Sequence, residues 1–92
     1  MSYQITNYTK NRAKQLGVSV KPSTRKGKKI DVYKNNNKVA SVGALGYKDY
    51  PTYMKTEGME VAKKRRKLYQ KRHQGEQHVL DSPGFYAWYL LW

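Results

Sequence analysis

The densest group of charged side chains lies in residues 63–73, KKRRKLYQKRH, which hold seven Lys and Arg. No Asp or Glu occurs between Glu60 and Glu76, whereas a merely solvated helix face normally mixes both signs. Such a run binds phosphates or acidic protein surfaces. Two other interpretations remain open. One is a nuclear import signal, because KKRRK fits the short basic pattern of such signals, and the other is a solvated helix face. The candidate binding residues here are Lys63, Lys64, Arg65, Arg66, Lys67, Lys71 and Arg72.

A second basic stretch, KPSTRKGKK, covers residues 21–29 and contains the turn-forming residues Pro22 and Gly27. A basic loop with a glycine can wrap around a nucleic-acid backbone, but a flexible surface turn has the same composition. Lys26, Lys28 and Lys29 are the candidates for polyanion or acidic-partner binding in this stretch.

Side chains that support catalysis or metal binding are not grouped in this way. His73 and His78 are the two imidazoles, and further ligands at a regular spacing are missing. The absence of Cys excludes disulfides and thiolate metal sites. Ser41 and Asp49 lie in no nucleophile elbow, paired carboxylate or phosphate cradle. We therefore predict that the protein is not an enzyme and uses no metal or cofactor.

The last nine residues, GFYAWYLLW, are nearly all apolar. Aromatic side chains spaced three and four apart would line one side of a helix there. These rings either cap the protein's own core or dock into a neighbour's groove, and both interpretations stay open. The candidate docking residues are Phe85, Trp88, Tyr89 and Trp92. Most of the other aromatics are predicted to be core, with nucleobase stacking as the alternative: Tyr3, Tyr8, Tyr33, Tyr47, Tyr50, Tyr53 and Tyr69.

The overall composition predicts one small, strongly cationic domain. The 92 residues include 19 Lys and Arg against 6 Asp and Glu, a net charge of +13. Such a field attracts polyanions and acidic surfaces. Leu, Ile, Val and Phe are scarce, so we expect a modest core completed by a partner or by further copies. No signal peptide is visible, and no apolar run reaches the ~20 residues of a membrane span.

The elements that must position these side chains predict an α+β fold. Residues 1–6 are expected to form a frayed arm or an edge strand. A helix should follow, capped by Asn7 and ended by Gly17. Alternation at Val18 and Val20 predicts a strand. The stretch from about 29 to 44, with NNN at its centre, predicts an antiparallel β-hairpin in a two- or three-stranded sheet.

The second half of the chain should hold a long basic helix over about residues 51–73. Asp49 and Pro51 mark its start, and Gly58 either kinks it or divides it into two helices. Ser82 followed by Pro83 favours a short aromatic helix at the end, with an extended segment as the alternative. We divide the chain into a small basic α+β domain, residues 1–80, and an aromatic docking or core-capping segment, residues 81–92.

Four stretches in this order, LGVSVKPSTRKGKKIDVY, KVASVGALGYKDYPTY, RRKLYQKRH and GFYAWYLLW, carry a resemblance. Residues 12–92 are similar to a family of short, basic, uncharacterised proteins of large DNA viruses of algae and protists, the chlorella virus and mimivirus relatives. GALGYKDYPTY and the closing Leu-Trp are the most specific pieces. Trp88 and Tyr89 stand where the family has polar residues. The resemblance implies a virion-associated protein and transfers no site residues.

The two separate features, one cationic and one aromatic, predict an adhesive protein. Our first hypothesis is a non-enzymatic minor capsid or cement protein of a large DNA virus, present in several copies in the virion. It would contact acidic capsid surfaces or the genome, and pass through host cytoplasm or nucleus during assembly. The alternative is a protein that binds and condenses viral DNA through phosphates. We see no motif that aims side chains at base edges.

Overall fold

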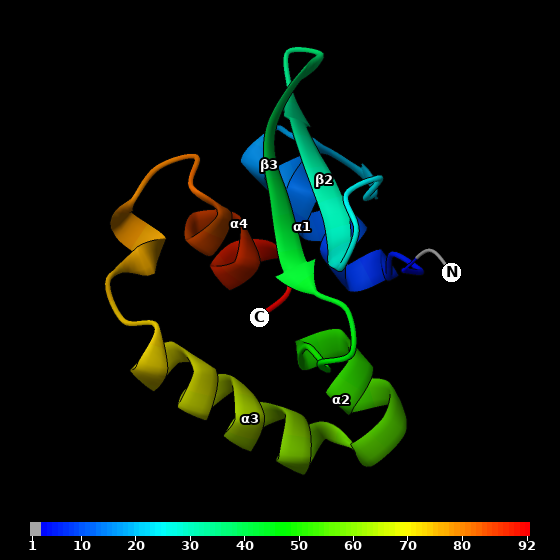
Figure 1. Cartoon of the computed structure of the whole chain (residues 1–92). Coiled ribbons are helices and arrows are strands. Elements are labelled where there is room, and N and C mark those ends of the chain that lie inside the picture. Colours follow the sequence, from blue (N-terminus) through cyan, green and yellow to red (C-terminus); the bar gives the residue numbers. More distant parts are fainter. Residues whose placement is uncertain (1–2) are drawn as a thin grey trace.

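The computed structural model describes residues 3–92, and Met1 and Ser2 lie outside the described part. Within residues 3–92, three antiparallel strands and four α-helices form a single α+β domain, which confirms the predicted fold class (Figure 1). A short 3₁₀ helix, η1, connects the last two α-helices. In chain order the elements are α1 Asn7–Leu16, β1 Ser19–Pro22, β2 Lys28–Lys34, β3 Asn37–Ala44, α2 Tyr50–Glu57, α3 Met59–Arg72, η1 Glu76–His78 and α4 Pro83–Leu90.

The sheet has the order β1-β2-β3 and is built around the predicted hairpin. β2 and β3 close at the pair Lys34 and Asn37, so the loop is the two residues Asn35 and Asn36. Both have positive φ, 51° and 66°. A two-residue hairpin loop of type I′ needs positive φ at both positions, and Asn tolerates it well. The hairpin prediction is therefore confirmed, and the turn sets the register next to the loop, before an irregularity between Val32 and Tyr33 shifts it by one residue.

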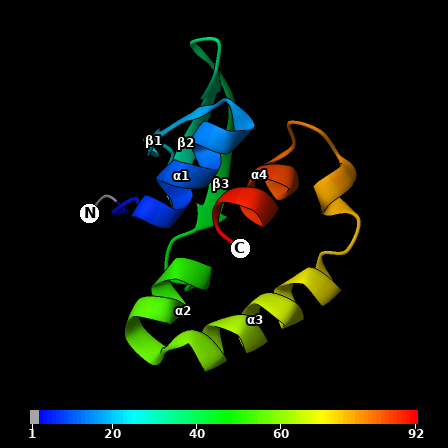
Figure 2. The same ribbon diagram turned by 180° about the vertical axis from the view of Figure 1, so that it is seen from behind.

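The core lies between the sheet and the two helices that cover it. Ile30, Val32 and Val42 contribute its sheet side and are fully buried. α4 packs on β3 and also contacts α1, as both views show (Figures 1 and 2). The C-terminal segment contributes Leu90 and Leu91, which are at most 2% exposed. The end of the chain is thus part of the domain's own core.

The first helix follows its predicted bounds closely. The Thr6 side chain accepts a hydrogen bond from the Thr9 backbone N–H, so the N-cap is one residue earlier than predicted. Gly17 ends the helix at φ 75°, as predicted. Residues 3–6 belong to no strand, so the edge-strand alternative is wrong for them. Residues 1 and 2 of the predicted arm lie outside the described residues.

The predicted helix of residues 51–73 is two helices, which is the second of the two alternatives. Asp49 caps α2 by accepting a hydrogen bond from the Thr52 backbone N–H at 3.1 Å, and Pro51 occupies the first turn. Gly58 separates α2 from α3 with φ 91° and ψ 167°. Residues with a Cβ rarely adopt this conformation, so a glycine at this position makes the break possible. α3 then runs along the outside of the molecule (Figure 1).

α3 is attached to the rest of the protein along a narrow stripe. Ala62 and Tyr69 are its buried residues. The Tyr69 ring stacks on the Trp92 ring, with centroids 4.4 Å apart and planes 6° apart. Arg66 lies 4.1 Å from the centroid of the Tyr50 ring. Because so little of α3 is buried, most of its side chains remain available for contacts outside the domain.

Candidate functional site

The outer face of α3 carries four lysines, Lys63, Lys64, Lys67 and Lys71, which we call the outer lysines. All four are exposed. Their spacing of three and four residues places them on one side of the helix. Within residues 3–92, none of them forms an ion pair. This face is therefore an uncompensated cationic surface.

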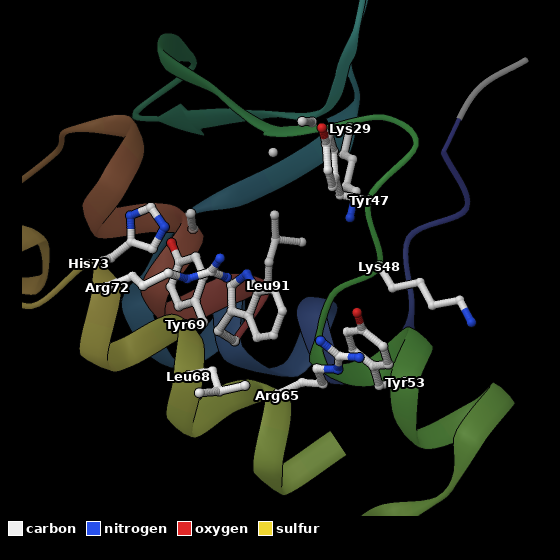
Figure 3. Close-up of a pocket in the computed structure, with 14 residues that line it drawn as sticks. Lys29, Tyr47, Lys48, Tyr53, Arg65, Leu68, Tyr69, Arg72, His73 and Leu91 are labelled. Carbon is white, nitrogen blue, oxygen red and sulfur yellow. The ribbon is translucent and has the colours of Figure 1, made fainter. Parts of the chain in front are cut away.

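The opposite side of the basic run faces the protein. Arg65, Leu68, Tyr69 and Arg72, at positions i, i+3, i+4 and i+7, line one side of a cavity (Figure 3). Arg66 packs on an aromatic ring between the two faces. The run that the sequence presented as one cationic patch is thus divided: four lysines point outward and two arginines point into a cavity.

The cavity lies between α3, the connection from β3 to α2, and the C-terminal segment, and has a volume of about 450 Å³. Arg65 and Arg72 are exposed and lie on its α3 side. Lys48 lies on the other side, where its Nζ is 2.8 Å from the Glu57 carboxylate. No Asp or Glu is among the described residues that line the cavity. The two arginines therefore have no acidic neighbour in the lining.

Aromatic rings form much of the remaining wall. Tyr69 is stacked between His73, at 4.3 Å between ring centroids, and Trp92. Burial, and to a smaller extent Glu76, raise the pKa of Tyr69 to about 12, so its phenol is neutral. Tyr47 differs from these rings because it is 76% exposed. Among the described residues, no ring and no cation packs on it. The cavity lining thus includes one open aromatic face, that of Tyr47 (Figure 3).

Lys29 corrects the predicted polyanion-binding set. It is 4% exposed, and its Nζ lies 2.9 Å from the Asp49 carboxylate. Burial alone would raise the pKa of Asp49, but hydrogen bonds from Thr52 and Tyr3, together with the Lys29 charge, bring that pKa below its ordinary value. Lys29 is therefore an internal partner of a buried carboxylate, and its inclusion among the external cations was wrong.

Lys26 and Lys28 belong to the other predicted basic patch: Lys26 lies in the connection between β1 and β2, and Lys28 is the first residue of β2. Lys26 is exposed and Lys28 is partly buried. Asp31 holds this connection by accepting hydrogen bonds from the Ser23 hydroxyl at 2.6 Å and the Thr24 backbone N–H at 3.3 Å. Both views show the connection well separated from α3 (Figures 1 and 2). The two basic stretches are thus separate surfaces.

The four candidate docking residues of the tail share an intermediate position. Phe85, Trp88 and Tyr89 are partly buried on α4, and Trp92 is partly buried beside the cavity. The sequence did not single out the fully buried side of the segment, which is formed by Tyr86, Leu90 and Leu91. The i, i+4 spacing of Tyr86 and Leu90 is the signal that would have found it. The Tyr86 hydroxyl donates to Asp81, which fixes the start of α4.

The described residues, 3–92, contain neither a candidate metal site nor a helix that could span a membrane. No group of three or more His, Asp or Glu side chains is placed to hold a metal ion there. His73 and Glu76 contact each other as an i, i+3 pair, a contact that sequence reasoning missed. No helix in this part of the chain has the length and apolar character needed to span a membrane.

Comparison with known proteins gives one result. Residues 18–57 match a family of unknown function (DUF5754). The matched segment runs from β1 through α2 and includes Lys29 and Asp49. It stops before α3, so the outer lysines, the two cavity arginines and the aromatic tail lie outside it. No curated protein and no solved structure matches the chain.

Proposed function

We propose that this protein is a non-enzymatic interaction protein that attaches to an extended acidic surface through the outer lysines. The observation that carries the proposal is the exposure of four unpaired lysines on one face of α3. A net charge of +13 adds a long-range field that favours encounter with such a surface. The lysines lie on a helix that begins after Gly58 and ends at the C-cap His73, so the face is a defined element of the fold.

The setting we propose is the particle of a large DNA virus, where the protein would act as a minor capsid or cement component. The resemblance of residues 12–92 to short basic proteins of such viruses supports this setting. Acidic capsid surfaces, or the genome beneath them, would meet the outer lysines. Several copies per particle would let individually weak cationic contacts act together.

The second candidate is a protein that binds and condenses viral DNA without reading its sequence. The spacing of the outer lysines favours it, because residues 63–71 extend roughly 12 Å along α3, at 1.5 Å per residue. Duplex DNA carries one charge per about 1.7 Å of its axis, so several phosphates lie within reach of this face. Sequence-independent phosphate contact needs no aimed side chains.

Duplex binding at two salt concentrations tests the cationic face. If the four outer lysines each neutralise one phosphate, log K falls with log salt at a slope of about −3.6, or roughly 150-fold between 50 and 200 mM. Replacing all four with Gln should remove most of this slope. The matched control carries the same charge change at exposed lysines elsewhere: Lys10→Gln, Lys14→Gln, Lys21→Gln and Lys55→Gln. Equal loss in both variants would contradict the proposal, because it would mean that only net charge matters.

Particle fractionation separates the two candidates. A cement protein binds random duplex weakly but stays with the purified shell at a fixed ratio, and the outer-lysine variant is lost from it. A DNA-condensing protein binds duplex at micromolar levels or tighter and leaves the particle with the genome. Both candidates are refuted if the wild-type protein neither stays with the shell nor binds duplex DNA, and the matched control variant behaves in the same way.

A further inference from the structure

The cavity behind α3 has an aromatic wall and a cationic wall. The aromatic wall is formed by Tyr47 and by the edge of the Tyr69 and Trp92 stack. The cationic wall is formed by Arg65 and Arg72 seven residues apart on one helix face. Its volume of about 450 Å³ falls in the range of small-molecule sites.

The chemistry of these walls identifies the class of ligand. Guanidinium groups bind phosphate oxygens in a planar, two-pronged manner that lysine cannot reproduce. Exposed aromatic rings bind planar bases by stacking, independently of base identity. Tyr47 is the ring with a free face, since it is 76% exposed. Of the other lining rings, Tyr69 and Trp92 stack on each other, and Tyr53 packs against Trp92 and under the Arg65 guanidinium group. A ligand with one flat ring and one phosphate group uses both walls.

We propose that this cavity binds a nucleoside phosphate, either as a free nucleotide or as one unit of a single-stranded nucleic acid. The base lies against Tyr47, next to the edge of the Tyr69 and Trp92 stack, and the phosphate contacts Arg65 and Arg72. This inference goes beyond the proposed function, because it concerns the inner side of α3 and does not involve the outer lysines. The proposal rests on the placement of Arg65 and Arg72 in the same cavity as Tyr47, on the side of α3 away from the outer lysines.

Trp92 supplies a direct measurement. In a Trp88→Phe background it is the one remaining tryptophan, so its fluorescence reports on the cavity. ADP is the probe, with adenosine as the ligand that lacks phosphate and inorganic pyrophosphate as the ligand that lacks a base. We expect ADP to change Trp92 fluorescence and to bind at least tenfold more tightly than either fragment. Pyrophosphate binding as tight as ADP binding would overturn the proposal, because the site would then bind anions only.

Three variants assign the contacts. Tyr47→Ala should weaken ADP binding by roughly tenfold, because it removes one stacked ring. Arg65→Gln together with Arg72→Gln should weaken both ADP and pyrophosphate. The outer-lysine variant, with its four Lys→Gln changes, should bind ADP within about twofold of the wild type. The side chains changed at these positions are all exposed, and circular dichroism checks that each variant folds.

The remaining arms distinguish the ligand's source and the alternatives. A single strand of four deoxyadenosine nucleotides that binds tenfold more tightly than ADP assigns the site to a nucleic acid, whereas equal affinity assigns it to free nucleotide. An acidic tyrosine-containing peptide that binds more tightly than both would overturn the proposal in favour of a protein partner. Full ADP affinity in the Tyr47→Ala variant, or no binding at millimolar ADP, would also overturn it. Loss of duplex binding in the outer-lysine variant with ADP binding retained shows that the two sites stand or fall separately.

Discussion

The ion pair between Lys29 and Asp49 should behave as a unit, and a double-mutant cycle measures it. Asp49 is fully buried and Lys29 is 4% exposed, so each charge relies on the other. Removing one member of a buried pair typically costs about 3–5 kcal/mol, because the remaining charge is left without its partner. After Lys29→Met, hydrogen bonds from Tyr3 and Thr52 still reach the carboxylate. We therefore expect the lower end of the range, about 3 kcal/mol.

The second arm is Asp49→Asn, which keeps a side chain that caps helices well but leaves the Lys29 ammonium group without its carboxylate. Its expected cost is also about 3 kcal/mol, since the same pair is broken from the other side. The double variant removes both charges and should lose less stability than the two single losses added together. The expected coupling is about 2 kcal/mol or more, in the range found for contacting residues.

Urea unfolding, followed by circular dichroism, gives each free energy of unfolding. In a thermal melt of a domain of this size, a loss of 3 kcal/mol also lowers Tm by roughly 12–24 °C, which is easily resolved. The control is Lys38→Met, because Lys38 is 43% exposed and its Nζ is 3.4 Å from Asp31. An exposed lysine in such a pair contributes only about 0–1 kcal/mol. Strict additivity of the Lys29 and Asp49 effects would refute the reasoning, because it would show that the two charges do not depend on each other.

Two further predictions concern other positions of the fold. Gly43→Ala should cost about 2–4 kcal/mol, since φ is +82° and the new Cβ would lie 2.7 Å from Leu91 Cδ1. The control is Gly46→Ala, because Gly46 has a similar φ but open space around it. Equal losses of stability for the two variants in a thermal melt would contradict the role of Leu91. For Asp31, burial acts to raise the pKa, but hydrogen bonds from Ser23 and Ser41 outweigh it and lower the pKa from 3.8 to about 2. The folded-state pKa is depressed, so its stabilising contribution is complete above about pH 4 and is lost as the pH falls toward 2. The variant Asp31→Asn should flatten this part of the stability curve, and an unchanged acid slope would count against it.

Local signals in the sequence predicted the elements well, because each depends on a few neighbouring residues. The paired asparagines at 35 and 36 permit the left-handed turn of the hairpin, whatever the rest of the chain does. Ser82 and Pro83 start α4 by capping and by a preset φ, and both effects act within one turn. Gly58 was recognised as an interruption, but only its φ and ψ decide between a kink and a break.

The candidate site was harder to predict, because it depends on contacts between distant parts of the chain. The sequence neighbours of Lys29 are as basic as those of Lys26 and Lys28. What distinguishes Lys29 is its buried ion pair with Asp49, which lies twenty residues further along the chain. The cavity likewise joins α3 to Tyr47 and to Trp92, which no spacing rule connects. Sequence periodicity shows which residues share a helix face, but not which face meets the body of the protein.

The division of α3 into two cationic faces follows from how weakly the helix is attached. A helix with a broad apolar stripe lies flat on its core and leaves no space beneath it. α3 has two buried side chains, so it is held through Tyr69 and stands away from the sheet elsewhere. The stack of Tyr69 on Trp92 and the packing of Arg66 on Tyr50 hold two neighbouring turns of the helix against the rest of the protein. The same sparse packing that exposes the outer lysines therefore also opens the cavity, and a chain with a fuller apolar stripe would have neither.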